Sequence, residues 1–390
     1  MTATANVVQG CESAFPKAEY DARVKKAREG LVAAGLDAMV VTGPENIFYL
    51  TGQQTPGYYM FQALVLPVDG DPVFVIRQLE YFNFIANTFI ADAAVYQDGE
   101  DPIAFLTKVL TEKGLRGKRV AIDKRGWFLP IAVYESMQQA LGAIGDAAGI
   151  VENLRMVKSP PELEKLERAA GYVDAGMRAG MAAVRGGNTE NDLVAAMMGA
   201  AIAAGSEYMG MEPLVSSGPR SGVPHGTWKR RRLQAGDAVL LEMAGCHDRY
   251  HAALMRTAWI GKPPAQAVEM MKVCLEALAV SLEKVRPGVP CEVPHLAAQA
   301  VIDKAGYTNS FRKRLGYGIG ISFAPDWGEG GIIGLNKGVT VPLQPGMVFH
   351  LPPALRIYGQ FTVGVSETIA ITERGYRQLG TIGRDLVQVG

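Results

Sequence analysis

The first part of the chain contains apolar residues at helical spacing and also short continuous apolar runs. The former predict helices and the latter predict strands. Residues 19–34 repeat apolar positions at helical spacing and end at Gly35, a common helix stop. Two further stretches predict helices, at residues 103–113 and 131–141. Short apolar runs predict strands, at residues 36–41, 63–68, 72–76 and 119–123. The alternation of helix and strand favours a layered α/β domain.

The pattern changes near residue 158. Pro160 and Pro161 follow Ser159, which is placed to cap a helix, so we set a domain boundary between residues 157 and 158. Beyond it the spacing predicts long helices, at residues 162–184, 190–204, 265–285 and 292–305. Strand-like runs lie between them from residue 212 onward. The sequence thus predicts two domains, residues 1–157 and 158–390, with an α+β arrangement in the second.

Composition and charge narrow the class of partner. The 390 residues include 39 Lys and Arg against 39 Asp and Glu, so no net charge attracts nucleic acid or an anionic membrane. No apolar run approaches the ~20 residues of a membrane helix, and residues 1–17 lack a basic start followed by an apolar core. The four cysteines show no CxxC pair. We expect a cytoplasmic protein that binds a small molecule, with neither nucleic acid nor membrane as a partner.

Glu242 is the anomalous residue of the second domain. It stands in the middle of a nearly continuous apolar strand, residues 237–245. Because burying an ionised carboxylate is costly, such a residue is paired, protonated or functional, and a structural ion pair is the alternative to a catalytic role. A turn then leads to a second strand, residues 251–260, where alternation places His251, Ala253 and Met255 on one face.

His225 is the second candidate for chemistry, in the loop Pro224-His225-Gly226. The ordinary pKa of a histidine side chain lies closest to neutrality, which suits it to proton transfer. A solvated loop histidine is nevertheless the default interpretation. The glycine-rich residues 316–320 lack the GxGxxG spacing of a nucleotide site. Asp326, Trp327 and Glu329 follow that loop and could hold a cation, with surface pairing as the default.

Longer segments resemble one known family. These are "LDAMVVTGPENIFYLTG", "MVKSPPELEKLERAA", "GDAVLLEMAGCHDRYHAALMRTAWIG", "LGYGIG" and "LQPGMVFHLPPA". They are similar to the pita-bread superfamily of creatinase, prolidase and aminopeptidase P over nearly the whole chain. The resemblance implies a creatinase-type α/β domain at residues 1–157 and a pita-bread catalytic domain at residues 158–390.

The metal ligands of that family do not carry over. Its metallopeptidases bind two ions through two Asp, one His and two Glu. By resemblance these positions fall on Glu242, Ala253, Tyr317, Pro352 and Ser366. One oxygen ligand of the five remains, and a dinuclear site needs several carboxylates. We therefore expect no metal and no cofactor.

The metal-free branch of the family fits better. His225 stands at the creatinase interval before Asp237, and Tyr317 also matches creatinase, but Met255, Pro352 and Met60 replace its substrate-binding charges. Creatine is therefore not the expected substrate. The segments "EMAGCHDRYH", "RTAWIGKPP", "GISFAPDWGE" and "LQPGMVFH" most resemble ectoine hydrolase, which opens a cyclic amidine.

This resemblance implies a metal-independent hydrolase of a non-peptide C–N bond in a small cyclic amidine or a related amidine, guanidine or amide. Glu242 would be the nucleophile or general base, and His225 would protonate the departing nitrogen. The expected substrate-binding residues are Tyr58, Gln62, Trp228, His251, Tyr317, Trp327, His350 and Glu367. Family members of this form are homodimers with the site near the subunit interface, and the aromatic tip at residues 58–61 suits that role.

Two alternatives remain. The chain could be an Xaa-Pro dipeptidase or aminopeptidase P-like peptidase with an unusual site, which Ala253 and Pro352 argue against. It could also be a catalytically inactive pita-bread binding protein, which the presence of both His225 and Glu242 argues against. The identity of the substrate stays open.

Overall fold

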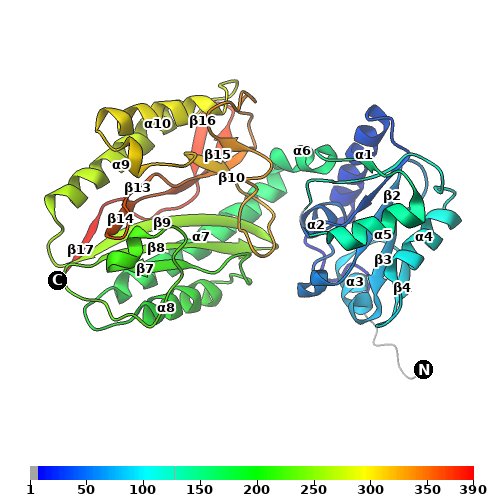
Figure 1. Cartoon of the computed structure of the whole chain (residues 1–390), viewed down its shortest axis with the longest axis horizontal. Coiled ribbons are helices and arrows are strands. Elements are labelled where there is room, and N and C mark those ends of the chain that lie inside the picture. Colours follow the sequence, from blue (N-terminus) through cyan, green and yellow to red (C-terminus); the bar gives the residue numbers. More distant parts are fainter. Residues whose placement is uncertain (1–7, 127) are drawn as a thin grey trace. The chain divides into compact units, whose positions relative to one another are not determined.

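The computed structural model describes residues 8–126 and 128–390, and it divides the chain into two compact units (Figure 1). Unit 1 is Met1–Arg155 and unit 2 is Met156–Gly390. The sequence placed the domain boundary close to this division, between residues 157 and 158. Buried apolar clusters lie within each unit, so each is organised around its own core.

Unit 1 is built on a mixed sheet with the strand order β4-β3-β2-β1-β5-β6. The central β1 runs antiparallel to β2 and parallel to β5. The residues of β1 and β2 are all buried, so both faces of these strands are covered. The strands are β1 (Ala38–Val41), β2 (Ala63–Pro67), β3 (Val73–Arg77), β4 (Asp92–Tyr96), β5 (Val120–Ile122) and β6 (Gly145–Asp146).

Helices supply that cover. Alternate residues of the central strands pack with apolar residues of α4 and α5 in one cluster, and the residues between them are buried on the other face. The helices are α1 (Lys17–Ala33), α2 (Pro44–Thr51), α3 (Tyr81–Asn87), α4 (Pro102–Glu112), α5 (Ile131–Leu141) and α6 (Ile150–Met156), with 3-10 turns η1 (Pro56–Tyr59) and η2 (Gln78–Glu80). The predicted α/β first domain is confirmed.

The centre of unit 2 is a long antiparallel hairpin. β8 (Ala238–His247) and β9 (Tyr250–Ile260) pair along their whole length. Asp248 and Arg249 form the turn with φ values of 47° and 64°, the left-handed conformation that fits a two-residue turn to the twist of its strands. β7 (Leu214–Ser217) pairs with β8, and β17 (Val387–Val389) pairs with β9.

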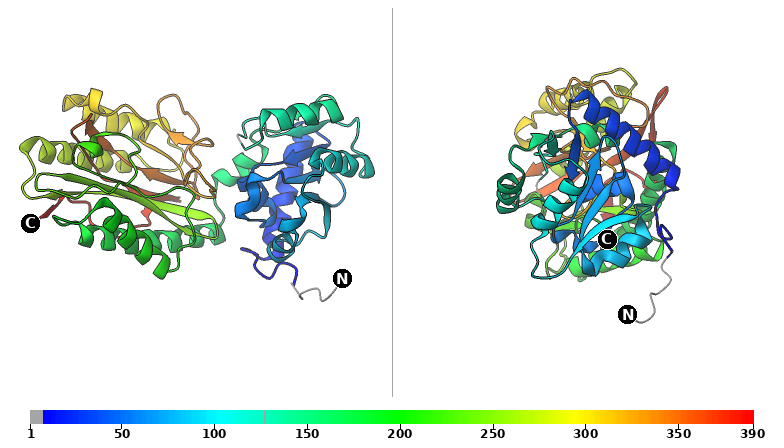
Figure 2. Two further views of the ribbon diagram at one scale, coloured as in Figure 1. Left: turned by 60° about the horizontal axis from the view of Figure 1, so that its bottom comes forward. Right: turned by 90° about the vertical axis from the view of Figure 1, so that its right-hand side faces the viewer.

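Two helix pairs lie on opposite sides of the strands of unit 2 (Figures 1 and 2). α7 (Pro160–Ala183) and α8 (Glu190–Ala203) pack on the β8–β9 hairpin, whereas α9 (Ala265–Glu283) and α10 (Glu292–Lys304) pack on the later strands. Those strands are β10 (Gly316–Gly318), β11 (Gly334–Leu335), β12 (Val348–Leu351), β13 (Ala354–Ile357), β14 (Phe361–Gly364), β15 (Glu367–Thr372) and β16 (Gly375–Gln378). Short 3-10 turns are η3 (Gly218–Gly222) and η4 (Thr308–Ser310). The predicted α+β class is confirmed.

The predicted helix start at Ser159 is present as a capping box. The Ser159 side chain caps the first turn of α7, and the Glu162 carboxylate accepts the Ser159 N–H at 2.8 Å. The second oxygen of Glu162 accepts a 2.7 Å hydrogen bond from the Tyr250 hydroxyl, which ties α7 to β9. Among the residues that the structure describes, no helix is both long and apolar enough to cross a bilayer.

Candidate active site

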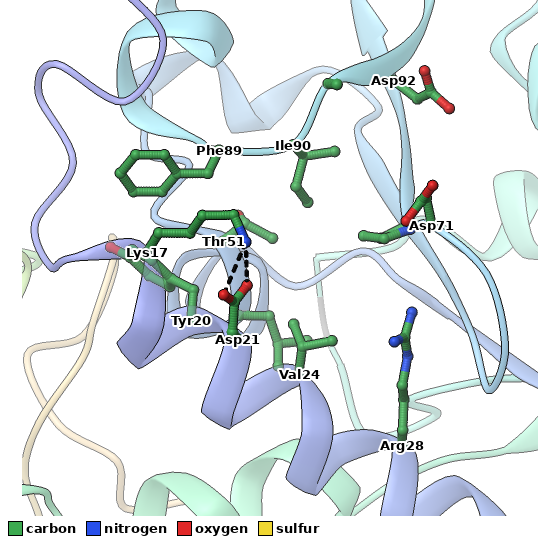
Figure 3. A pocket seen from close by; sticks show the side chains of 13 residues that line it. Lys17, Tyr20, Asp21, Val24, Arg28, Thr51, Asp71, Phe89, Ile90 and Asp92 are labelled. Atoms are coloured by element: carbon green, nitrogen blue, oxygen red, sulfur yellow. Dashed lines mark hydrogen bonds and ion pairs between the residues drawn. The ribbon is translucent and has the colours of Figure 1, made fainter.

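A hollow of about 390 Å³ lies beside α1 in unit 1, but it contains none of the predicted site residues (Figure 3). Most of its charged groups already have partners. Lys17 donates to Asp21 at 2.7 Å, Arg28 donates to the Pro67 carbonyl at 3.0 Å, and Asp92 lies 3.4 Å from Lys113. We therefore place the candidate active site in unit 2, where the chemically unusual side chains gather.

Glu242 occupies the middle of β8 on the face turned away from α7 and α8. Leu241 and Met243 on either side of it belong to the cluster under those helices, so strand alternation directs Glu242 to the opposite face. Its cross-strand neighbour is Met255 of β9. The other residues of β8 up to Cys246 are buried, whereas Glu242 keeps partial exposure. A partly accessible carboxylate in a buried strand is placed to meet a small molecule.

Two cationic side chains and one histidine act on Glu242. Burial raises the pKa of its carboxyl group, and Lys313, Arg356 and His225 oppose that rise. Among residues 8–126 and 128–390, no side chain makes a hydrogen bond or an ion pair to Glu242. Glu242 is therefore not the structural ion pair that the sequence left as the alternative, and its two oxygens remain available.

His225 is brought to Glu242 by the loop that follows β7 and η3. Leu214 of β7 pairs directly with Glu242, and Gly226 lies against Ser216, so the loop folds back along β7. His225 is exposed and has a φ of 53°, a left-handed conformation that is uncommon for a residue other than glycine. The structure thus brings together the two predicted catalytic residues.

Glu190 anchors both ends of the His225 loop. This buried carboxylate, at the first position of α8, accepts hydrogen bonds from the Ser217 N–H at 2.8 Å and the Ser217 hydroxyl at 2.7 Å. It also accepts the Lys229 N–H at 2.6 Å and pairs with Arg220. A single side chain therefore fixes the loop before and after His225. The sequence pointed to neither this anchor nor the role of Glu190.

Tyr317, His350 and Ser366 form a continuous hydrogen-bonded chain. Tyr317 of β10 pairs across the sheet with His350 of β12, and the Tyr317 hydroxyl lies 2.9 Å from His350 Nδ1. His350 Nε2 lies 2.7 Å from Ser366 Oγ, which also accepts the Met255 N–H at 2.7 Å. Trp327 Nε1 donates to the Tyr317 hydroxyl at 2.9 Å. The Met255 N–H therefore ties this chain of hydrogen bonds to the residue of β9 that pairs with Glu242.

Burial keeps the members of this chain neutral. It lowers the pKa of His350 to about 3, and the charges of Lys313 and Arg256 add to the effect. It raises the pKa of Tyr317 far above its ordinary value, and the nearby negative charge of Glu242 raises it further. A neutral imidazole donates from one nitrogen and accepts at the other, so it joins the Tyr317 and Ser366 hydroxyls without a charge of its own.

Other predicted pocket residues lie differently. Trp228 packs against the cluster on the α7–α8 side of the hairpin, the face opposite to Glu242. His251 is fully buried, with Nε2 accepting the Gly210 N–H at 3.0 Å and Nδ1 lying 2.9 Å from the Arg249 carbonyl. The contacts of His251 correct the prediction that it is a pocket wall, because both of its ring nitrogens are used within the fold. The part of Trp228 in the pocket stays a prediction.

Glu367 is also corrected. Its Oε1 accepts hydrogen bonds from Arg256 and Arg384, each at 2.9 Å, and the residue is fully buried. It is one end of a buried ion-pair cluster rather than a substrate contact. Tyr58 and Gln62 belong to unit 1, where Tyr58 packs edge-on against Phe128 and Gln62 is buried. Their part in substrate binding stays a prediction.

Two cations beside Glu242 were missed by sequence reasoning. Lys313 lies in the loop before β10 and Arg356 lies on β13, far from Glu242 in the sequence. A basic residue in a polar loop is usually solvated, so Lys313 carried no signal. Arg356 did carry one, because it interrupts the short apolar run of residues 354–357.

Family models match nearly the whole chain. Residues 23–157 match the Creatinase/Prolidase N-terminal domain, and residues 164–373, more than half of the chain, match Metallopeptidase family M24. The chain belongs to metallopeptidase family M24. The predicted membership of the pita-bread superfamily is therefore confirmed for this M24 protein, and the family is one of hydrolases.

Relatives of this M24 protein differ in activity. The ectoine hydrolase of Halomonas elongata is 29% identical over 393 residues, which cover 95% of this chain and 98% of that protein. A dipeptidase from Mycobacterium ulcerans has a similar structure, with a TM-score of 0.83, 26% identity, and coverage of 96% of this chain and 99% of that one. A prolidase from Thermococcus sibiricus has a TM-score of 0.86 at 24% identity, covers 95% and 99% of the two chains, and shows the shared fold.

The side chains of this M24 protein do not fit the two metal ions that the family name implies. Of the five ligand positions inferred by resemblance, Ala253 and Pro352 have no donor atom, and Tyr317 and Ser366 are tied to His350. Only Glu242 is a carboxylate. Within the described ranges, no three His, Cys, Asp or Glu side chains gather as a metal centre requires. We derive no chemical step through a metal.

Proposed function

We propose that this protein hydrolyses a non-peptide C–N bond in a small cyclic amidine or a related compound, with Glu242 and His225 as its catalytic residues. The observation that supports this most directly is that Glu242, a carboxylate with no hydrogen bond among the described residues, lies within electrostatic reach of the accessible His225. Of the other ligand positions, Tyr317 and Ser366 are hydrogen-bonded to His350, and Ala253 and Pro352 have no donor atom. The similarity to an ectoine hydrolase supports the same choice of substrate class.

The proposed reaction adds water across the amidine carbon. Glu242 attacks that carbon, or takes a proton from a water that does, so that a new C–O bond forms. The C–N bond to one amidine nitrogen then breaks, and His225 delivers a proton to that nitrogen as it leaves. Where Glu242 itself attacks, water then cleaves the C–O bond to Glu242 and frees its carboxylate. The ring-opened product carries both an amide and an amine, and it contains the atoms of the amidine and one water. Burial keeps Tyr317 neutral near Glu242, and its hydroxyl is hydrogen-bonded to His350 and Trp327.

Product analysis tests this proposal. The purified protein is incubated with a cyclic amidine carboxylic acid, a guanidino acid and an Xaa-Pro dipeptide, each with and without Mn²⁺ and with and without a chelator. We expect the protein to open the ring of the amidine at the same rate with and without the chelator. NMR identifies the opened product. Hydrolysis of the dipeptide that requires added Mn²⁺ would instead support the peptidase alternative, which the similarity to a dipeptidase keeps open.

The inactive-protein alternative is tested in the same samples. If no compound is hydrolysed under any condition, but the amidine raises the melting temperature, the protein binds this class of ligand without turning it over. That result would contradict the proposed catalytic roles and favour a binding protein.

A further inference from the structure

Lys313 and Arg356 are two positive charges on the same side of the sheet as Glu242. Ala354 of β13 packs with Leu240 and Met255, which lie on the Glu242 face of the hairpin. Arg356 follows Ala354 by two positions along the strand, so its side chain leaves from the same face. The charges of both Lys313 and Arg356 act on Glu242.

Neither cation has a partner among the residues that the structure describes. No hydrogen bond or ion pair joins Lys313 or Arg356 to another described side chain or to the backbone. The Nε atom of Arg356 is buried and makes no hydrogen bond. Arg256 of β9 is different, because it donates to Glu367, to Gly383 and to Ser366. The partly buried Arg356 therefore has donors that the folded chain leaves unused.

The charges in this region do not balance. Two cations face one carboxylate, and burial lowers the pKa of Lys313 to about 8, with the like charge of Arg356 lowering it further. Burial lowers the pKa of Arg356 as well. Glu242 can compensate one of the two positive charges, so one remains. A buried cation without a partner is costly, and an incoming anion would relieve that cost.

We propose that Lys313 and Arg356 form a binding site for a carboxylate of the substrate, which makes the substrate a small amidine or amide that also carries an acid group. This inference deepens the proposed function and rests on it for the identity of the reacting group. The planar guanidinium of Arg356 suits paired hydrogen bonds to the two carboxylate oxygens, and the ammonium of Lys313 supplies a compact second charge. The acid group would thus hold the substrate while Glu242 reaches the amidine carbon.

The experiment compares matched substrates and matched variants. The substrates are a cyclic amidine with a ring carboxylate and the same ring with a carboxamide. The variants are Arg356→Gln and Lys313→Gln, with Arg312→Gln as the control because Arg312 is exposed in the same loop as Lys313. Steady-state kinetics gives KM and kcat for each pair. Isothermal titration calorimetry of the two compounds measures binding without turnover.

For the unaltered protein we expect a kcat/KM about 10- to 100-fold higher with the carboxylate than with the carboxamide. Arg356→Gln and Lys313→Gln should lose most of that preference through a higher KM for the carboxylate. Because both charges also act on Glu242, kcat should change alike for the two substrates, so the preference is judged from the ratio of their KM values. Arg312→Gln should keep the preference. Equal changes in KM for both substrates, or no preference in the unaltered protein, would overturn the carboxylate site.

Calorimetry separates this inference from the proposed function. If the unaltered protein turns over neither compound but binds the carboxylate, and Arg356→Gln abolishes that binding, the carboxylate site stands and the proposed reaction fails. If the protein binds the two compounds equally well, or binds neither, the carboxylate site fails whatever the turnover. Circular dichroism of each variant confirms that it is folded before it is compared.

Discussion

Ser366 lies at a metal-ligand position inferred by resemblance to the family, and its hydroxyl joins two buried groups. It accepts the Met255 N–H and lies 2.7 Å from His350 Nε2. A hydroxyl that serves two buried partners in this way is part of the structural support of the site. Its loss would leave both partners unsatisfied in a region that water does not reach.

We therefore expect Ser366→Ala to destabilise the protein by about 1–3 kcal/mol, because it leaves a buried N–H and a buried imidazole nitrogen without a partner. Urea unfolding measures the change. Ser366→Cys, which keeps a weak donor and acceptor, should lose less. The exposed residue Ser136, whose hydroxyl bonds a helix carbonyl, provides the control Ser136→Ala, which should change stability little. Equal effects of the two alanine variants would contradict the supporting role.

Catalysis gives the second prediction at this scale. Glu242→Gln keeps the shape of the side chain but cannot act as a base or nucleophile, so turnover should fall by about 10⁴-fold or more. His225→Asn should lose the general-acid contribution, about 10²–10⁴-fold, and a substrate with a better leaving nitrogen should partly restore it. Asparagine also tolerates the left-handed backbone that His225 adopts.

The exposed Glu276 of α9 provides a matched control, because Glu276→Gln makes the same chemical change away from the site. It should leave both turnover and melting temperature unaltered. Near-normal turnover of Glu242→Gln would refute its assignment and direct attention to Asp326. A large fall in the melting temperature of either catalytic variant would show that the residue acts mainly on the fold.

At the scale of elements, the His225 loop depends on α8 because Glu190 holds both of its ends. Glu190→Gln removes the buried charge and leaves Arg220 and the Lys229 N–H poorly paired, so we expect a loss on the order of 3 kcal/mol. We also expect faster amide hydrogen exchange across residues 217–229 and a lower kcat at little change in KM. Exchange that rises equally throughout unit 2 would indicate a general loss of stability instead.

In unit 1, two carboxyl groups join β5 to α6 and titrate together. Burial and the neighbouring Glu152 raise the pKa of Asp123 from 3.8 to about 7. The protonated Asp123 donates a hydrogen bond to Glu152, and this bond, with that of Asn46 and the charge of Arg155, lowers the pKa of Glu152. Asp123 is therefore protonated in the folded chain at pH values where the unfolded chain has lost that proton. Its contribution to stability is complete below about pH 4 and is lost as the pH rises through about 7.

Asp123→Asn removes this titration while it keeps a group of the same size. The unaltered protein should lose stability as the pH rises from 4.5 to 8 relative to this variant, as urea midpoints across that range would show. Asp98→Asn is the control, because Asp98 is an exposed partner of Arg77. Parallel pH profiles for the unaltered protein and Asp123→Asn would rule out the shared proton.

The sequence predicted elements well where apolar spacing was long and regular, and less well where it was not. The helix expected at residues 131–141 matches α5, and the expected long helices of the second domain match α7 to α10 within a few residues at their ends. α2 was missed because its residues are buried nearly all round, which erases the amphipathic signal. β6, β10 and β11 were missed because two or three residues are too few for a periodic pattern.

Only part of the candidate site could be predicted from the sequence. Glu242, His225, Tyr317, Trp327 and His350 were found through an anomalous charge or through resemblance, and the structure groups them. Lys313 gave no signal and Arg356 gave a weak one, because their significance lies in the lack of a partner among the described residues, which only the packed chain reveals. His251 and Glu367 were expected in the pocket, but residue type alone does not show that a polar side chain is fully buried and bonded within the fold.

At the scale of the whole molecule, we expect a homodimer, as the family resemblance implies. In unit 1 the side chain of Tyr59 is 75% exposed at the aromatic tip of residues 58–61, and a large exposed aromatic group is a frequent interface residue. Light scattering at micromolar concentration should give twice the mass of 41.8 kDa. Tyr59→Ser should weaken the association. A monomer mass in the unaltered protein would remove the support for a site near the subunit interface.

The whole molecule should also retain no stoichiometric transition metal after purification, since one carboxylate cannot balance two divalent ions. Elemental analysis of the purified protein, before and after incubation with Mn²⁺ and a desalting step, measures this. About two ions per chain would contradict the assignment to a metal-free branch.

The two-residue turn at Asp248 and Arg249 has a consequence for how such genes diverge. It fixes the register in which Glu242 faces Met255, and a shift of one residue along a strand turns every side chain to the other face. A single codon gained or lost between positions 242 and 255 would thus bury the carboxylate under α7 and expose the helix-facing residues. Homologous genes that keep the activity should tolerate substitutions in this interval but hold its length constant, so insertions there would mark lineages in which the reaction has been abandoned.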